Sequence, residues 1–202
     1  MKKSVLSIVL TVVMLFSLPV AAWAYDPIIA YGQCGAWNTS TPSEIPWVLW
    51  DTGKLTISGE GHMENYTYRR GAPWEAYKEQ IKEVMVYGKQ DELESFVLAI
   101  GNHAFRGCVN LTKVTIPDTV VVIGENAFSG CKSLKEITIP DSVEKISNQA
   151  FGGCKSLKEV ALPDSLKEIS DSLFAGSGIE SIEFPAGLTR IGSSAFSKSS
   201  LI

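Results

Sequence analysis

Histidine and basic side chains are scarce in this 202-residue sequence, and both shortages exclude classes of function. Only two histidines are present, which leaves little for histidine-based catalysis or metal binding. The 18 lysines and arginines are outnumbered by 22 aspartates and glutamates, so the formal net charge is −4. A nucleic-acid binder needs a concentrated basic face to neutralise phosphates, and this balance argues against that class.

The first 24 residues have the pattern of a secretory signal peptide. Lys2 and Lys3 precede an apolar run over residues 5–18, and Ala22-Trp23-Ala24 supplies a small-residue cleavage site. We expect cleavage before Tyr25, and therefore a secreted or surface-displayed mature chain with no membrane span. An uncleaved membrane anchor is the alternative, although the apolar run is short for a bilayer.

A 23-residue repeat dominates the rest of the sequence. Three consecutive copies begin at Ile100, Ile123 and Ile146, a fourth from Ile169 is one residue shorter, and a fifth from Ile191 covers half a repeat. A unit of this size cannot bury its own apolar side, so the copies must stack as a solenoid in which equivalent residues form ladders. An incomplete earlier turn is visible in Ile81, Val84 and Val86, which match Leu111, Val114 and Ile116 and precede the insertion QDELESF.

Each repeat predicts one short strand and one tight return turn. Apolar residues alternate at period two after the first position of each strand, and a proline ends it because proline lacks the N–H that a ladder needs. The predicted strands cover residues 111–116, 134–139, 157–162 and 179–184. The return turns carry a phenylalanine spine followed by glycines, where a positive φ or a close backbone approach is needed: Phe105, Phe128, Phe151, Phe174 and Phe196, then Gly107, Gly130, Gly153 and Gly176.

The repeat pattern I-G-x-x-A-F-x-G-C-x-x-L-x-x-V-x-I-P-x-x-V resembles the BspA-like leucine-rich repeat family of secreted and surface bacterial proteins. The resemblance covers residues 81–202, and VLWDTGKLTISGEGHMENY with APWEAY resembles the cap that often precedes such repeats. It implies a curved α/β-type leucine-rich repeat solenoid, with short parallel strands on the concave side and short helical or 3₁₀ turns on the convex side. Members of the family are thought to bind host matrix proteins and other cells. The departures are the missing residue after Gly176, and Ser177 and Ser199 in place of cysteine.

Residues 25–80 form a distinct aromatic zone ahead of the repeats at 81–202. Five of the six tyrosines lie there, the sixth is Tyr87, and the 23-residue copies from Ile100 onward contain neither tyrosine nor tryptophan. Residues 54–58 alternate like a strand after the turn Asp51-Thr52-Gly53. We interpret the zone as a β-rich cap that closes the first turn. The alternative is a carbohydrate-binding accessory module in which Trp47 and Trp50 stack on sugars.

No catalytic motif is present, and we expect no enzyme activity, cofactor or metal site. The sequence lacks H-E-x-x-H, G-x-S-x-G and a phosphate-binding loop. His103 stands where other repeats have Asn126, Gln149, Ser172 or Ser194, which predicts an exposed turn residue. His62 lies between glycines with no identifiable partner.

Two further ladders have plain structural explanations. Cys108, Cys131 and Cys154 recur every 23 residues and would stack about 5 Å apart with parallel side chains. We expect buried thiols, while a disulfide and a partner for Cys34 stay open. The aspartates that follow the strand-ending prolines predict turn residues that accept backbone N–H bonds, with a cation ladder as the alternative: Asp118, Asp141 and Asp164.

The outward side of the strand row is the predicted partner surface. Its side chains are small and mixed in charge, which suits broad polar contact with an extracellular protein such as a host matrix protein, although a solvated sheet face would have the same composition. The predicted contact residues are Lys113, Thr115, Glu136, Thr138, Glu159, Ser181 and Glu183. The half repeat at the end supplies no closing turn, so we also expect self-association through that uncapped end.

Overall fold

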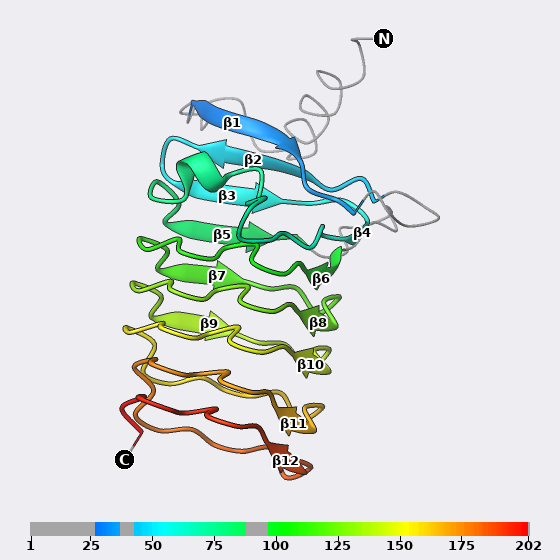
Figure 1. Ribbon diagram of the computed structural model, residues 1–202. Coiled ribbons are helices and arrows are strands. Elements are labelled where there is room, and N and C mark those ends of the chain that lie inside the picture. Colours follow the sequence, from blue (N-terminus) through cyan, green and yellow to red (C-terminus); the bar gives the residue numbers. More distant parts are fainter. Residues whose placement is uncertain (1–26, 37–42, 88–96, 202) are drawn as a thin grey trace, which may run out of the picture.

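The chain folds as a stack of similar turns, and the computed structural model describes residues 27–36, 43–87 and 97–201. Figure 1 shows two rows of strands that run along the stack from β1 at one end to β12 at the other. The strands are β1 (Ile28–Gln33), β2 (Pro46–Trp50), β3 (Lys54–Ile57), β4 (Gly61–His62), β5 (Glu83–Val86), β6 (Val97–Ile100), β7 (Lys113–Thr115), β8 (Val122–Ile123), β9 (Glu136–Thr138), β10 (Lys145–Ile146), β11 (Glu168–Ile169) and β12 (Arg190–Ile191).

The first row is a six-stranded sheet in the order β1-β2-β3-β5-β7-β9. Its first three strands are antiparallel, and β3, β5, β7 and β9 are parallel. In β3, Leu55 and Ile57 are fully buried while their neighbours are half-buried, because side chains alternate between the faces of a strand. Gly53 turns the chain into β3 at φ +84°, where an added Cβ would lie 2.5 Å from the Gln80 carbonyl oxygen. The turn therefore requires glycine.

The sheet crosses the predicted boundary between the aromatic zone and the repeats without a break. Val84 of β5 is in register with Leu55 of β3 on one side and with Val114 of β7 on the other. The match of Val84 to Val114, expected from the repeat pattern, is confirmed. The domain limits at residues 25–80 and 81–202 stay predictions, and the signal peptide at 1–24 and the insertion QDELESF lie outside the described residues.

The strands of the later repeats differ from the prediction. β7 and β9 match the first two predicted strands, but residues 157–162 and 179–184 are not strands. These two segments are joined by a backbone bond from the Glu180 N–H to the Lys158 oxygen, 3.0 Å. Ala161, a weak strand former, replaces the threonine found in β7 and β9, and the fourth repeat is one residue shorter.

A second row of strands, which the sequence pattern did not predict, lines another edge of the stack. It comprises the parallel sheet β10-β8-β6-β4 and the pair β11-β12. These strands are two to four residues long. β8, β10 and β11 each begin after the tight turn that follows a strand-ending proline, and each places one fully buried isoleucine inward: Ile123, Ile146 and Ile169.

The predicted phenylalanine spine is confirmed as the centre of the core. Successive rings stack with centroids 5.2–5.7 Å apart and planes 1–15° apart from Phe105 to Phe196. Trp74 extends the stack, 5.4 Å from Phe105, and its Nε1–H donates to the Ala104 oxygen at 2.8 Å. Trp47 packs edge-on against Trp74 at 5.6 Å. The aromatic zone therefore continues the core of the repeats over the first turn.

The return turns are hydrogen-bonded turns and not helices. Within the described ranges the helical element is one 3₁₀ helix, Glu75–Tyr77, in the aromatic zone. The helical or 3₁₀ turns implied for each repeat are thus absent from residues 97–201. The four spine glycines have φ between 66° and 75°, as their position predicts. In the described parts of the chain, no helix is both long and apolar enough to cross a membrane.

His103 corrects one expectation. It is half-buried, not exposed, because its ring lies edge-on to Tyr68 with centroids 4.8 Å apart. Its φ is +55°, and its equivalents in the following turns have φ between 54° and 57°. The left-handed backbone, and not exposure alone, selects the residue types here, since asparagine and other short polar residues tolerate that region better than β-branched ones.

Hydroxyl groups, and not the predicted aspartates, bind the turns after the first three strand-ending prolines. The Ser142 Oγ–H donates to the Val120 oxygen of the preceding turn at 2.8 Å, and Thr119 and Ser165 make the equivalent bonds at 3.0 and 2.6 Å. The carboxylates of the aspartates one position earlier make no hydrogen bond to a described residue. Each of these aspartates, Asp118, Asp141 and Asp164, is exposed.

Candidate functional site

The outward side chains of β3, β5, β7 and β9, with the equivalent positions of the next two turns, form a surface that we name the strand face. Lys54, Glu83, Lys113 and Glu136 are in direct register across the four strands. Neighbouring parallel strands lie about 4.8 Å apart, so these four side chains form one row of alternating charge. The inward neighbours of this row, such as Val114 and Ile137, are buried and hold the strands flat against the core.

A second row beside the charged one consists mainly of threonine. Thr115 of β7 is in register with Thr138 of β9 and with Met85 of β5, which in turn pairs with Thr56. β-branched threonine suits an exposed position on a pleated sheet. The strand face therefore offers hydroxyls and methyls next to a row of alternating charge.

All seven predicted contact residues are exposed, but they do not share one sheet. Lys113, Thr115, Glu136 and Thr138 lie on neighbouring strands and are brought together by the register. Glu159, Ser181 and Glu183 lie at equivalent positions of turns that carry no strand there. Beside them Lys158 pairs with Glu180 of the next turn, an exposed ion pair of the kind that contributes little to stability.

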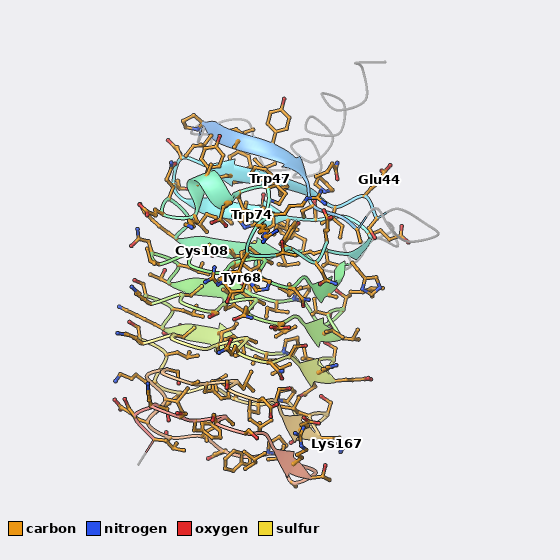
Figure 2. The ribbon with its side chains drawn as sticks, in the orientation of Figure 1. Glu44, Trp47, Tyr68, Trp74, Cys108 and Lys167 are labelled. Carbon is orange, nitrogen blue, oxygen red and sulfur yellow. The ribbon has the colours of Figure 1, made fainter. Side chains whose placement is uncertain are left out.

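An open groove follows the second row of strands. A volume of about 710 Å³ is lined there by acidic and basic side chains in alternation, among them Glu144, Lys145, Lys167 and Glu168. Figure 2 shows Lys167 at the edge of the stack close to β11 and β12. At the end of this groove Arg190 pairs with Glu168 and lies 3.6 Å from the Asp171 carboxylate. Because charges of both signs line this groove, its described residues present no concentrated charge of one sign to a small ligand.

The cysteines behave as buried apolar residues. The Sγ–H of Cys131 donates to the Phe105 oxygen at 3.1 Å, and that of Cys154 donates to the Phe128 oxygen at 3.2 Å. Burial raises the pKa of the Cys108 and Cys154 thiols from 9.0 to about 12, and it raises the pKa of Cys131 as well. All four cysteines, including Cys34, are free. The prediction of buried thiols is confirmed, and protonated thiols of this kind are poor nucleophiles and poor metal ligands.

No arrangement of catalytic side chains is found among residues 27–36, 43–87 and 97–201. Those ranges contain no group of three or more His, Cys, Asp or Glu side chains placed to hold a metal ion. Burial lowers the pKa of His103, an effect that Glu125 opposes, and the Nδ1 atom has no hydrogen-bond partner among the described residues. His62 is exposed at the end of β4.

The cluster of Tyr68, His103 and Arg106 was not predicted from the sequence. The Arg106 guanidinium carbon lies 3.9 Å from the centre of the Tyr68 ring, and His103 packs on the same tyrosine. A signal was present in the repeat alignment: position 106 is an arginine only in the first return turn, and its equivalents are small. They are Ser129, Gly152, Ala175 and Ser197.

The two tryptophans of the carbohydrate-binding alternative do not form an exposed surface for stacking on sugars. Trp47 is 4% exposed and packs inside the core, so its ring faces are unavailable to a sugar. Trp50 is half-buried, and its Nε1–H donates to the Thr56 hydroxyl oxygen at 3.3 Å. The two tryptophans serve the packing of the first strands.

Comparison with known families matches residues 89–202 to the BspA type leucine-rich repeat region, in six copies. No curated protein matches the chain. Several solved structures are similar. A leucine-rich repeat protein from Eubacterium ventriosum is 33% identical with a TM-score of 0.64, over 80% of this chain and 40% of that one.

Two further structures extend the similarity. The T. pallidum leucine-rich repeat protein is 28% identical with a TM-score of 0.53, over 85% of this chain and 65% of that one. A leucine-rich cell surface protein from Faecalibacterium prausnitzii shares the fold at 23% identity, with a TM-score of 0.54 over 81% of this chain and 56% of that one. The chain thus spans less than two thirds of the length of each of these three proteins.

Proposed function

The chain belongs to the BspA-type leucine-rich repeat family, and on that basis we propose that it is an extracellular protein-interaction module. We propose further that it is secreted or displayed on the cell surface, and that it adheres to host matrix proteins or other cells without catalysing a reaction. The matched family, and a similar fold in a protein described as a cell surface protein, support this proposal.

The observation that carries the proposal is the row of alternating charge on the strand face. Lys54, Glu83, Lys113 and Glu136 are fixed by hydrogen-bonded strands, so a partner meets them without ordering a loop first. A backbone that is already ordered avoids the conformational entropy that ordering a loop would cost on binding. A charge row of fixed spacing favours protein surfaces with the complementary order and disfavours others, because like charges in contact are repelled.

The test is binding of the purified protein to immobilised extracellular-matrix glycoproteins. The double variant Lys113→Glu with Glu159→Lys reverses two charges of the strand face and leaves the net charge unchanged. We expect it to weaken binding by about tenfold or more, the loss of about 1.4 kcal/mol. The matched control Ser129→Lys places a new charge on a return turn and should leave affinity within about twofold.

Two results would contradict the proposal. Unchanged affinity of the double variant, together with loss of binding in the Ser129 variant, would move the contact surface to the return turns. Absence of binding to every matrix glycoprotein and to intact host cells would remove the adhesion function itself. The fold of each variant is checked by far-ultraviolet circular dichroism before affinity is compared.

We also propose self-association through the last turns. Phe184 and Ile191 are 46% and 53% exposed, Leu201 is 39% exposed, and β12 has a free edge in the described structure. Exposed apolar side chains beside an unpaired strand favour pairing with another copy. Sedimentation velocity should show dimers whose share rises with concentration. A monomer at every concentration would contradict this proposal and leave the strand-face proposal untouched.

A further inference from the structure

The return-turn side of the molecule carries a tyrosine that the fold holds out into solvent. Residues 65–74 cross the first repeat and are bonded to it: the Tyr66 N–H donates to the Asn102 oxygen at 3.0 Å, and the Asn102 N–H donates to the Asn65 Oδ1 at 2.9 Å. Between these bonds and the buried Trp74, Tyr68 is 68% exposed. Figure 2 labels Tyr68 on the upper turns of the stack, below the label of Trp74.

A short turn fixes the position of this tyrosine. The Thr67 N–H donates to the Arg70 oxygen at 2.9 Å, and the Arg70 N–H donates to the Thr67 hydroxyl oxygen at 3.1 Å. These two bonds close the segment, so Tyr68 and Arg69 stand together at its tip. An exposed aromatic ring on a closed turn costs little entropy when it binds, which is the property of a binding platform.

One arginine contacts this ring, and two more follow Tyr68 directly in the sequence. The sequence has only four arginines, and Arg69, Arg70 and Arg106 lie at or beside Tyr68. The Arg106 guanidinium lies over the ring at 3.9 Å, a cation–π contact, and it has no hydrogen bond or ion pair to a described residue. Its five N–H donors are therefore held in one orientation and remain available.

The charges around the ring leave two cations without a carboxylate partner in the described part of the chain. Arg70 is paired with Glu64 at 2.9 Å. Lys78 is paired with Glu75. Glu125 faces His103 and opposes the lowering of its pKa by burial. Arg69 and Arg106, on the turn tip and on the tyrosine, are therefore the free positive groups of the cluster.

We propose that Tyr68, Arg69 and Arg106 form a binding site for an acidic polysaccharide whose sugars carry carboxylates. The exposed part of the tyrosine ring accepts the flat C–H face of a sugar, and the arginine forks receive carboxylates through paired N–H donors. The exposed aromatic ring in contact with the free Arg106 guanidinium, and next in sequence to Arg69, favours a sugar over an acidic peptide, since glutamate chains have no flat ring to stack. The site lies on the return turns and does not depend on the proposed role of the strand face.

The test is isothermal titration calorimetry of the protein with a hexasaccharide of galacturonic acid. Separate titrations with a neutral galactose hexasaccharide and with hexaglutamate serve as comparisons. We expect binding of the galacturonate and at least tenfold weaker binding of the other two. Arg106→Ser, which installs the residue found at the equivalent positions 129 and 197, should weaken galacturonate binding about tenfold. The matched control Arg190→Ser removes the same charge at the far end of the stack and should change affinity less than about twofold.

Four outcomes would overturn the proposal. They are absence of galacturonate binding at millimolar concentration, equal binding of the neutral hexasaccharide, equal binding of hexaglutamate, and equal losses in the Arg106 and Arg190 variants. The third would identify an acidic peptide site, and the fourth a diffuse electrostatic attraction. If Arg106→Ser does not fold, Arg69→Ser at the exposed turn tip replaces it, and it should weaken galacturonate binding about fivefold. Unchanged affinity of that variant would also overturn the proposal.

Discussion

Replacing one ring in the middle of the phenylalanine spine tests whether the stacked turns form a single core. Phe151 is fully buried and lies between Phe128 at 5.5 Å and Phe174 at 5.7 Å, with nearly parallel planes. Phe151→Ala removes the ring and leaves a cavity, a loss of about 3–5 kcal/mol in the free energy of unfolding. Each stacked aromatic pair contributes about 0.5–1.5 kcal/mol beyond its buried area, so loss of two neighbours accounts for about 1–3 kcal/mol of this.

Two variants separate the contributions. Phe151→Leu keeps most of the buried volume and loses the ring, so its expected cost is the stacking part, about 1–3 kcal/mol. Phe196 is half-buried and has one stacked neighbour, Phe174, at 5.6 Å. Phe196→Ala should therefore cost less than half as much as the same change at Phe151.

Urea unfolding followed by circular dichroism and by tryptophan fluorescence measures these costs. All five tryptophans precede residue 75, so fluorescence reports the aromatic zone while circular dichroism reports every turn. A solenoid is stabilised by nearest neighbours, and a central defect should separate the two unfolding transitions. A Phe151→Ala midpoint near that of the wild type, or equal losses at Phe151 and Phe196, would refute a continuous buried stack.

Three further predictions concern single features of the fold. Ser142→Ala should lower the free energy of unfolding by about 1 kcal/mol, because it removes the hydrogen bond to the Val120 oxygen. An unchanged free energy in urea unfolding would show that this hydroxyl bond between turns does not stabilise the fold. Burial raises the pKa of Cys108 and Cys154 to about 12, so the folded protein keeps thiol protons that the unfolded chain releases above pH 9. The contribution of these thiols to the free energy of unfolding should be constant below that pH and should be lost as the pH rises from about 9 to 12. A Cys108→Ala/Cys154→Ala variant should therefore show a smaller decline in unfolding free energy over that range. An identical decline in the variant and the wild type would contradict the raised thiol pKa values. His103→Asn should leave the melting temperature nearly unchanged, whereas His103→Val should lower it because φ is +55°; equal effects would exclude backbone control.

Periodicity made the core predictable in detail. A repeat of 23 residues places each phenylalanine on the next, so the stack from Phe105 to Phe196, the buried thiols and the positive-φ glycines follow from spacing alone. The register of Val84 with Val114 was predictable for the same reason. Features that recur once per turn are fixed by stacking, whatever their individual energies.

Features that occur once, or that depend on small energies, were not predictable in this way. Trp74 joins the spine from outside the repeats, and no periodic pattern reveals its stacking on Phe105. Whether residues 157–162 form a strand depends on weak propensities such as that of Ala161. The pairing of Tyr68 with Arg106 joins two residues far apart in sequence, and only the departure of position 106 from the small residues of later repeats pointed to it.

The most direct test of the strand face as the binding surface is chemical labelling of carboxylates in the free protein and in its complex with a matrix glycoprotein, read by mass spectrometry. Glu136 and Glu159 lie on the strand face, whereas Glu125 and Glu168 line the groove along the second row of strands, and all four are exposed. If the partner binds the strand face, it should lower the labelling of Glu136 and Glu159 several-fold and leave the labelling of Glu125 and Glu168 unchanged. Protection of Glu125 and Glu168 with full labelling of Glu136 and Glu159 would contradict binding at the strand face.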